Sequence, residues 1–171
     1  IDNKTPTAFK DAEAQVGSIT DVNGGDGTYG IRYTLADVAG SGFTFDYMYF
    51  PVHGTGDATG DEGFSGGGHG SLDAHDVTLT GSVPGVDGLN IGAGYYVANY
   101  DVPGSEDERH EGTAYATYAY GPLTFGYQVG AVAAAGLGGV TYKNTYAGIS
   151  YAVSDDLSIS YNNTKSRKGG G

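Results

Sequence analysis

The chain has 171 residues, of which 32 are Gly and 15 are Tyr, whereas Trp and Cys are absent. Its 20 acidic and 8 basic side chains give a net charge of -12, which argues against binding nucleic acid because the phosphates would be repelled. Without Cys there is no disulfide framework, thiolate metal site or cysteine nucleophile. The sparse large aliphatic residues suit a close-packed core poorly, whereas Gly and Tyr among alternating small and polar residues suit strands between lipid and water.

The first segment, residues 1–27, shows no alternation of apolar and polar side chains. Thr5 and Pro6 precede a stretch, 8–14, that is typical of a short helix with a capping Thr and Pro at its first position. Two interpretations stay open: a frayed terminal segment, or a folded loop that carries Asp11 and Glu13 into a pore.

Two alternating segments follow, each with a charged residue on its polar face. The first, from residue 28, places Arg32 opposite a stripe of Ile and Tyr, and the second, 43–49, places Asp46 opposite Phe and Tyr. Such charges are expected where one face lines water, and they would be costly in a dry core.

The connection 51–75 is rich in Gly, Asp, Ser and Thr, and it is too long for a compact domain unless it is functional or disordered. Its carboxylates could bind a hard cation such as calcium, although they lack the alternating spacing of an EF-hand loop. The candidate ligands are Asp57, Asp61 and Glu62. No pair of histidines has zinc-ligand spacing, so His53, His69, His75 and His110 are interpreted as solvated loop residues. We therefore expect no cofactor, with loop-bound calcium as the alternative.

One unit then occurs twice between residues 76 and 133: strand, tight turn, strand, long polar loop. Strands are predicted at 76–83 and 89–97, at 113–120 and 123–131, and finally at 145–153 and 157–162. The basic run 165–168, followed by three Gly, predicts entry into another long loop.

In total the sequence predicts eight strands joined by four short turns that alternate with three long loops. A soluble sandwich gives no reason for this alternation, whereas an outer-membrane barrel has short periplasmic turns and long external loops. Because backbone groups in lipid must be paired between strands, only a closed sheet can span a membrane. Tyr near the strand ends is consistent with interfacial girdles, although Tyr is also a good strand residue.

Two hairpins, 118–127 and 146–161, resemble those of general diffusion porins from alphaproteobacteria. This resemblance implies an all-β fold, a transmembrane antiparallel β-barrel of about sixteen strands in the bacterial outer membrane. It also implies a homotrimer surrounded by lipid and lipopolysaccharide, with passive diffusion of small hydrophilic solutes and ions.

The chain departs from that family in two ways: it has about half of the strands, and it lacks the terminal aromatic residue of the closing strand. It is therefore interpreted as one partial barrel domain, 1–171. Within it, 1–27 is the probable constriction loop, 28–165 holds about eight strands, and 51–75 is a long extracellular loop. The resemblance implies that Asp11 and Glu13 form the acidic side of the constriction and that Arg32 lies on the facing basic wall. Asp46, on the polar face of its strand, is a further candidate for a pore-lining residue.

The mechanism implied is steric and electrostatic, and the excess of carboxylates predicts a preference for cations. Two alternatives stay open. A closed eight-stranded barrel could act as an anchor, an adhesin or a narrow channel, and a secreted β surface protein could bind calcium. An enzyme is not expected, because the sequence has no nucleophile elbow, zinc-ligand spacing or phosphate-cradling motif.

Overall fold

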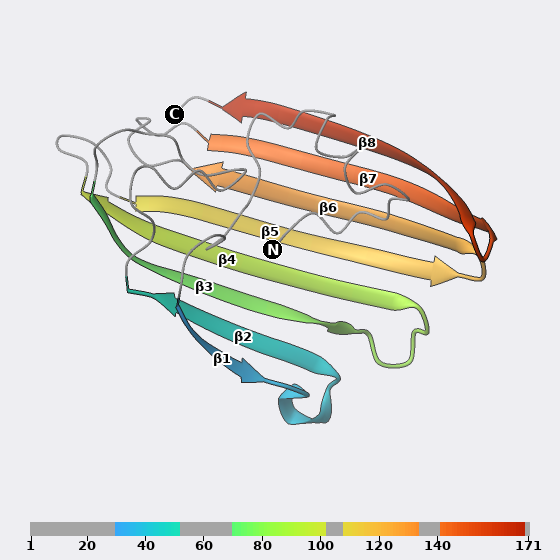
Figure 1. Ribbon diagram of the computed structural model, residues 1–171, viewed down its shortest axis with the longest axis horizontal. Helices are drawn as coiled ribbons and strands as arrows, with labels where there is room; N and C mark the ends of the chain where they lie inside the picture. The colour runs from blue at the N-terminus through green and yellow to red at the C-terminus, as the bar shows by residue number, and fades with distance from the viewer. Residues whose placement is uncertain (1–29, 52–69, 102–107, 134–140, 170–171) are drawn as a thin grey trace.

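The computed structural model describes residues 30–51, 70–101, 108–133 and 141–169, which form eight β-strands and one short 3-10 helix (Figure 1). None of these residues belongs to a helix long and apolar enough to cross a membrane. The elements are β1 (Ile31–Leu35), η1 (Val38–Gly40), β2 (Phe43–Phe50), β3 (Gly70–Ser82), β4 (Leu89–Asp101), β5 (Glu108–Tyr120), β6 (Leu123–Ala133), β7 (Thr141–Ser154) and β8 (Leu157–Gly169).

All eight strands form a single antiparallel sheet in which each strand pairs with its neighbours in the sequence, in the order β1 to β8. The short turns lie at one end of the sheet, and the strand ends that flank residues 52–69, 102–107 and 134–140 lie at the other (Figure 1). Within the described residues, β1 pairs only with β2 and β8 only with β7, so this sheet is open. The all-β prediction is confirmed, whereas closure into a barrel is not observed.

The β3–β4 turn depends on glycine. Gly85 and Gly88 both have φ +79°, a left-handed conformation that other residues adopt at a cost. Gly88 also lies against β5: the Ala119 amide donates to its carbonyl oxygen at 2.9 Å, and a Cβ on Gly88 would overlap the Ala119 carbonyl. This turn therefore packs directly on the end of the next hairpin.

The strand ends at the turns agree with the prediction within about one residue, but the opposite ends are longer than predicted. β3 begins at Gly70, inside the range 51–75 expected to be loop, and β5 begins at Glu108 rather than at residue 113. β8 continues to Gly169, so the prediction of loop entry at 165–168 was wrong. The extensions of β5 and β8 are polar on both faces, so alternation of apolar and polar side chains gives no signal there. The extension of β3 is short and contains Ala74.

A small apolar cluster lies at the loop end of β2, β3 and β4. Phe50, Ala74, Tyr96 and Ala98 are buried there, with Met48 packed against them. The rings of Phe50 and Tyr96 meet edge to face, with centroids 6.5 Å apart. Apart from this cluster, most large apolar side chains of the described strands are exposed.

Candidate functional site

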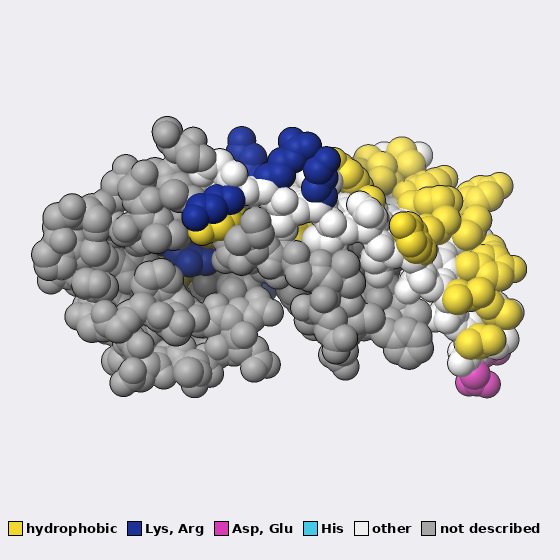
Figure 2. All heavy atoms as spheres, turned by 90° about the horizontal axis from the view of Figure 1, so that it is seen from above, with side chains coloured by type: hydrophobic (Ala, Val, Ile, Leu, Met, Phe, Trp, Pro, Cys, Tyr) yellow, Lys and Arg dark blue, Asp and Glu magenta, His cyan; other side chains and the backbone are white. Residues whose placement is uncertain are grey.

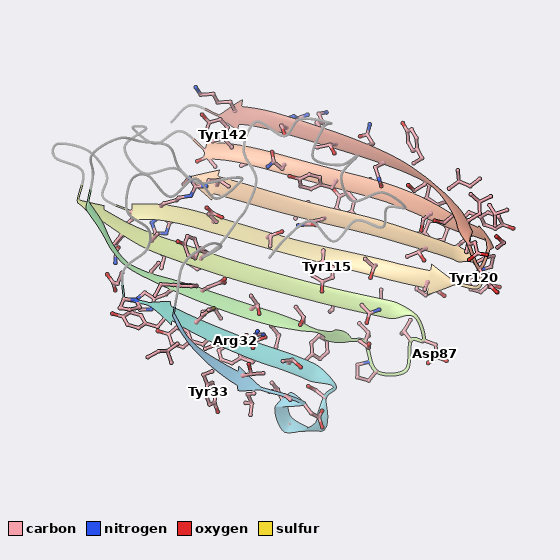
Figure 3. The ribbon with its side chains drawn as sticks, viewed as in Figure 1. Arg32, Tyr33, Asp87, Tyr115, Tyr120 and Tyr142 are labelled. Atoms are coloured by element: carbon pink, nitrogen blue, oxygen red, sulfur yellow. The ribbon has the colours of Figure 1, made fainter. Side chains whose placement is uncertain are left out.

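The strand register divides the sheet into an apolar face and a polar face. Residues that pair across strands point to the same side, so the register assigns each row of partners to one face of the sheet. The apolar face includes the paired rows that contain Tyr33, Leu35, Ile91, Tyr127 and Tyr151. Consecutive residues point to opposite sides, as Arg32 and Tyr33 do on β1 (Figure 3). One side of a single sheet is thus mainly apolar and the other mainly polar.

The apolar face is largely uncovered. Fourteen of its large side chains are 36–72% exposed, and with about 150–250 Å² per aromatic ring they present on the order of 1,000 Å² of apolar surface. Soluble monomers rarely expose more than a few hundred Å² in one patch. The residues are Ile31, Tyr33, Leu35, Leu79, Tyr95, Tyr118, Tyr120, Phe125, Tyr127, Val129, Ile149, Tyr151, Ile159 and Tyr161.

This apolar face is a band that runs obliquely across the strands. The row that starts at Leu35, the last residue of β1, reaches β8 at Lys165. β8 begins at the turn with apolar Leu157, eight residues before Lys165. The turn edge of the band therefore shifts by eight residues over seven strand-to-strand steps, and Figure 1 shows the turn ends advancing in this way.

The opposite edge of the band shifts by the same amount. The row of Ile31 reaches β8 at Gly169, but the last apolar residue of this face on β8 is Tyr161, again eight residues earlier. Eight residues of about 3.3 Å across seven spacings of about 4.8 Å correspond to a tilt of about 38°. The edges of the band lie perpendicular to the barrel axis when the strands are tilted by about 35–45° from that axis, the range found in transmembrane barrels.

The polar face carries an ion pair between the first two strands. Arg32 on β1 places Nε and Nη2 each 2.8 Å from Oδ1 of Asp46 on β2. The hydroxyl of Thr34 donates to the same oxygen at 2.5 Å. The Arg32 side chain is 60% exposed and that of Asp46 is 15% exposed, so this pair is accessible to solvent.

A second pair, between Arg109 and Glu111 of β5, is buried. Arg109 Nε donates to Glu111 Oε1, and the two side chains are 11% and 1% exposed. This pair was not predicted, because the residues before Thr113 were expected to lie in a loop. The residues of β5 before Gly112 are polar on both faces, so the alternation of apolar and polar residues gave no signal for this pair.

Further buried polar groups on this face are hydrogen bonded between strands. Gln128 Nε2 donates to Thr113 Oγ1 at 3.0 Å, and that hydroxyl donates to the Val129 carbonyl at 2.9 Å. Ser166 Oγ donates to Asn144 Oδ1 at 2.8 Å. These bonds offset the cost of burying polar groups and fix the side chains against the sheet.

An open hollow of about 450 Å³ lies on the turn half of the polar face. Gly92 lies beneath the ring of Tyr115, where any side chain would collide with the ring, so glycine allows Tyr115 to lie close to β4. The polar residues that line the hollow are Thr44, Thr80, Ser82, Asn90, Tyr115 and Thr117. Hydroxyl and amide groups of this kind bind water and polar solutes without fixed charge.

Two histidines lie in strands, so their assignment to loops was wrong. His75 Nδ1 is 2.8 Å from the Tyr47 hydroxyl, and its Nε2 is 3.2 Å from Asp73 Oδ2. In the same way, His110 Nδ1 is 2.7 Å from the Tyr95 hydroxyl, and its Nε2 lies 3.0 Å from a carboxylate oxygen of Glu108. Both groups lie at the loop edge of the apolar band, because His75 and His110 occupy one row of the register with Val97 between them.

Several predicted site residues lie outside the described part of the chain. These are the constriction residues Asp11 and Glu13 and the calcium candidates Asp57, Asp61 and Glu62. Among the described residues, no group of three His, Cys, Asp or Glu side chains could hold a metal ion. Arg32 and Asp46 both lie on the polar face, where they pair with each other.

No known family model matches this chain, and no curated protein shows significant sequence similarity to it.

Proposed function

We propose that this chain is part of a transmembrane antiparallel β-barrel, a porin of the bacterial outer membrane that forms a water-filled pore. Small hydrophilic solutes and ions would cross it by passive diffusion. The main support is the oblique apolar band, whose two edges shift equally and become level at the tilt of membrane-spanning strands. An opposite face of hydroxyls, amides and ion pairs supports a wet lumen.

The open sheet supports a barrel larger than eight strands. A closed eight-stranded barrel would pair β1 with β8, and the described residues show no such pairing. In a membrane the free edges of β1 and β8 would need partners, because unpaired backbone groups are not tolerated in lipid. We propose that further strands complete a barrel of about sixteen, assembled as a trimer.

The proposed cation preference depends on charge outside the described strands. The polar face carries three charges of each sign: Arg32, Arg109 and Lys168, and Asp46, Asp76 and Glu111. In the undescribed ranges, however, ten acidic and two basic residues give a net charge of -8 out of the -12 of the chain. Carboxylates near a narrow wet passage raise the local concentration of cations.

The test is the reversal potential of the natural protein in a planar lipid bilayer under a tenfold KCl gradient. We expect ohmic pores with a reversal potential of the sign that indicates cation selectivity. Asp11→Asn combined with Glu13→Gln should reduce this potential. Asp87→Asn, in the exposed β3–β4 turn (Figure 3), should leave it unchanged. Anion selectivity would contradict the cation preference, and the absence of conductance would contradict the pore.

A further inference from the structure

Three basic residues form a compact group beside the apolar band on β7 and β8. Lys143 pairs directly with Arg167 in the register, and Lys165 lies two residues from Arg167 on the same side of β8. Opposite Cβ atoms in a sheet are about 5 Å apart, and residues i and i+2 are about 7 Å apart. All three side chains are exposed. We refer to Lys143, Lys165 and Arg167 as the basic cluster.

The basic cluster is not neutralised by the strands around it. β6, β7 and β8 contain no Asp or Glu, although the chain has 20 acidic residues. The two arginines of the other strands, Arg32 and Arg109, each have a carboxylate partner. Among the described residues, the basic cluster has no ion pair. Three like charges placed this close repel one another, so an anion bound among them would be stabilised.

The cluster lies on the outer side of the headgroup layer of a membrane and within reach of it. In Figure 2, which views the molecule from the β8 edge, Lys and Arg side chains gather next to the hydrophobic ones. Lys165 lies four residues and Arg167 six residues beyond Tyr161, which is about 10 and 16 Å along the barrel axis at this tilt. The headgroup region extends about 5–8 Å beyond the hydrocarbon, and the long Lys and Arg side chains bend toward such an interface.

We propose that Lys143, Lys165 and Arg167 bind the phosphate groups of anionic lipids at the loop-side edge of the membrane. This inference rests on the proposed membrane-spanning function and names a lipid partner for the outer wall. Arg provides a planar donor pair for two phosphate oxygens, and Lys provides point charges. The carboxylates of a second copy are less suitable partners, because Asp73 and Glu108 at the same edge already contact His75 and His110.

The experiment is native mass spectrometry of the natural protein taken from vesicles of phosphatidylcholine with or without phosphatidylglycerol. The triple variant K143Q/K165Q/R167Q is compared with K168Q, because Lys168 lies on the polar face of the same strand, 5.8 Å from the centre of the Tyr142 ring. Each charge near an anionic lipid surface contributes about fivefold in affinity. We expect retention of phosphatidylglycerol to fall on the order of 100-fold in the triple variant and to be unchanged in K168Q.

Four outcomes would overturn this inference. Three are equal retention in the triple variant, a loss of bound lipid in K168Q as large as in the triple variant, and a drop in subunit number in place of lipid number. The fourth is displacement of the lipid by an equal concentration of inorganic phosphate, which would show a site for the free ion instead. Conductance measured on the same samples separates the two proposals. A wild-type protein that conducts but retains no anionic lipid contradicts only the lipid site, whereas a protein that neither inserts nor conducts contradicts both.

Discussion

At the residue scale, Gly85 and Gly88 provide a matched pair, because both have φ +79° but only Gly88 lies against another strand. Gly85→Ala should lower the free energy of unfolding by about 1 kcal/mol, the cost of a left-handed conformation for a side chain with Cβ. Gly88→Ala should cost at least about 1 kcal/mol more, because its Cβ overlaps the Ala119 carbonyl and weakens a hydrogen bond. Urea titration in lipid vesicles measures both values, and equal losses would show that the turn does not pack on β5.

The two ion pairs of the polar face allow a second comparison, because they differ in burial. Glu111→Gln leaves the Arg109 charge in a buried site, and removing one partner of such a pair typically costs about 3–5 kcal/mol. Asp46→Asn should have a much smaller effect, because water solvates the exposed Arg32 side chain. Thermal unfolding of both variants in one detergent tests this order. A larger loss for Asp46→Asn would contradict the assignment of the buried pair.

At the element scale, the turn ends of the strands could be predicted and the loop ends could not. The alternation of apolar and polar residues predicted that Arg32 and Asp46 lie on the polar face of their strands. Their ion pair, however, depends on the register of β1 against β2, which the sequence pattern does not specify. Beyond the apolar band both faces of a strand are polar, as in the last part of β8, so the two-residue alternation of apolar and polar side chains disappears. The same physical cause concealed Arg109 and Glu111 at the start of β5.

A lysine introduced on the apolar face of β5 should affect stability differently from a lysine introduced on its polar face. Ala116 lies on the apolar face beside Tyr127, and Thr117 borders the hollow on the polar face. Ala116→Lys should reduce stability in a bilayer by about 2–4 kcal/mol, the cost of a cation facing lipid. Thr117→Lys should change stability little and should lower the cation preference of the proposed pore. Folding titrations in vesicles, combined with reversal potentials, distinguish the two effects, and equal stability losses would contradict the proposed orientation of the sheet.

At the scale of the whole molecule, β1 and β8 each have one edge without a partner among the described residues, which predicts that additional strands complete the proposed barrel. The natural protein extracted from membranes should therefore have about twice the mass of these 171 residues, as an approximately sixteen-stranded barrel requires. Intact-mass spectrometry measures this directly. A mass equal to that of the 171 residues would contradict the large barrel and favour an eight-stranded one.

The strictly sequential order of the sheet also has a consequence for how the chain acquires its structure. Every strand pairs with the strand before it, so each new hairpin needs only the edge of its predecessor as a template. Contacts formed in this way are short in sequence separation, and the loop-closure entropy of each step is small. Assembly can therefore proceed one hairpin at a time from either end of the sheet.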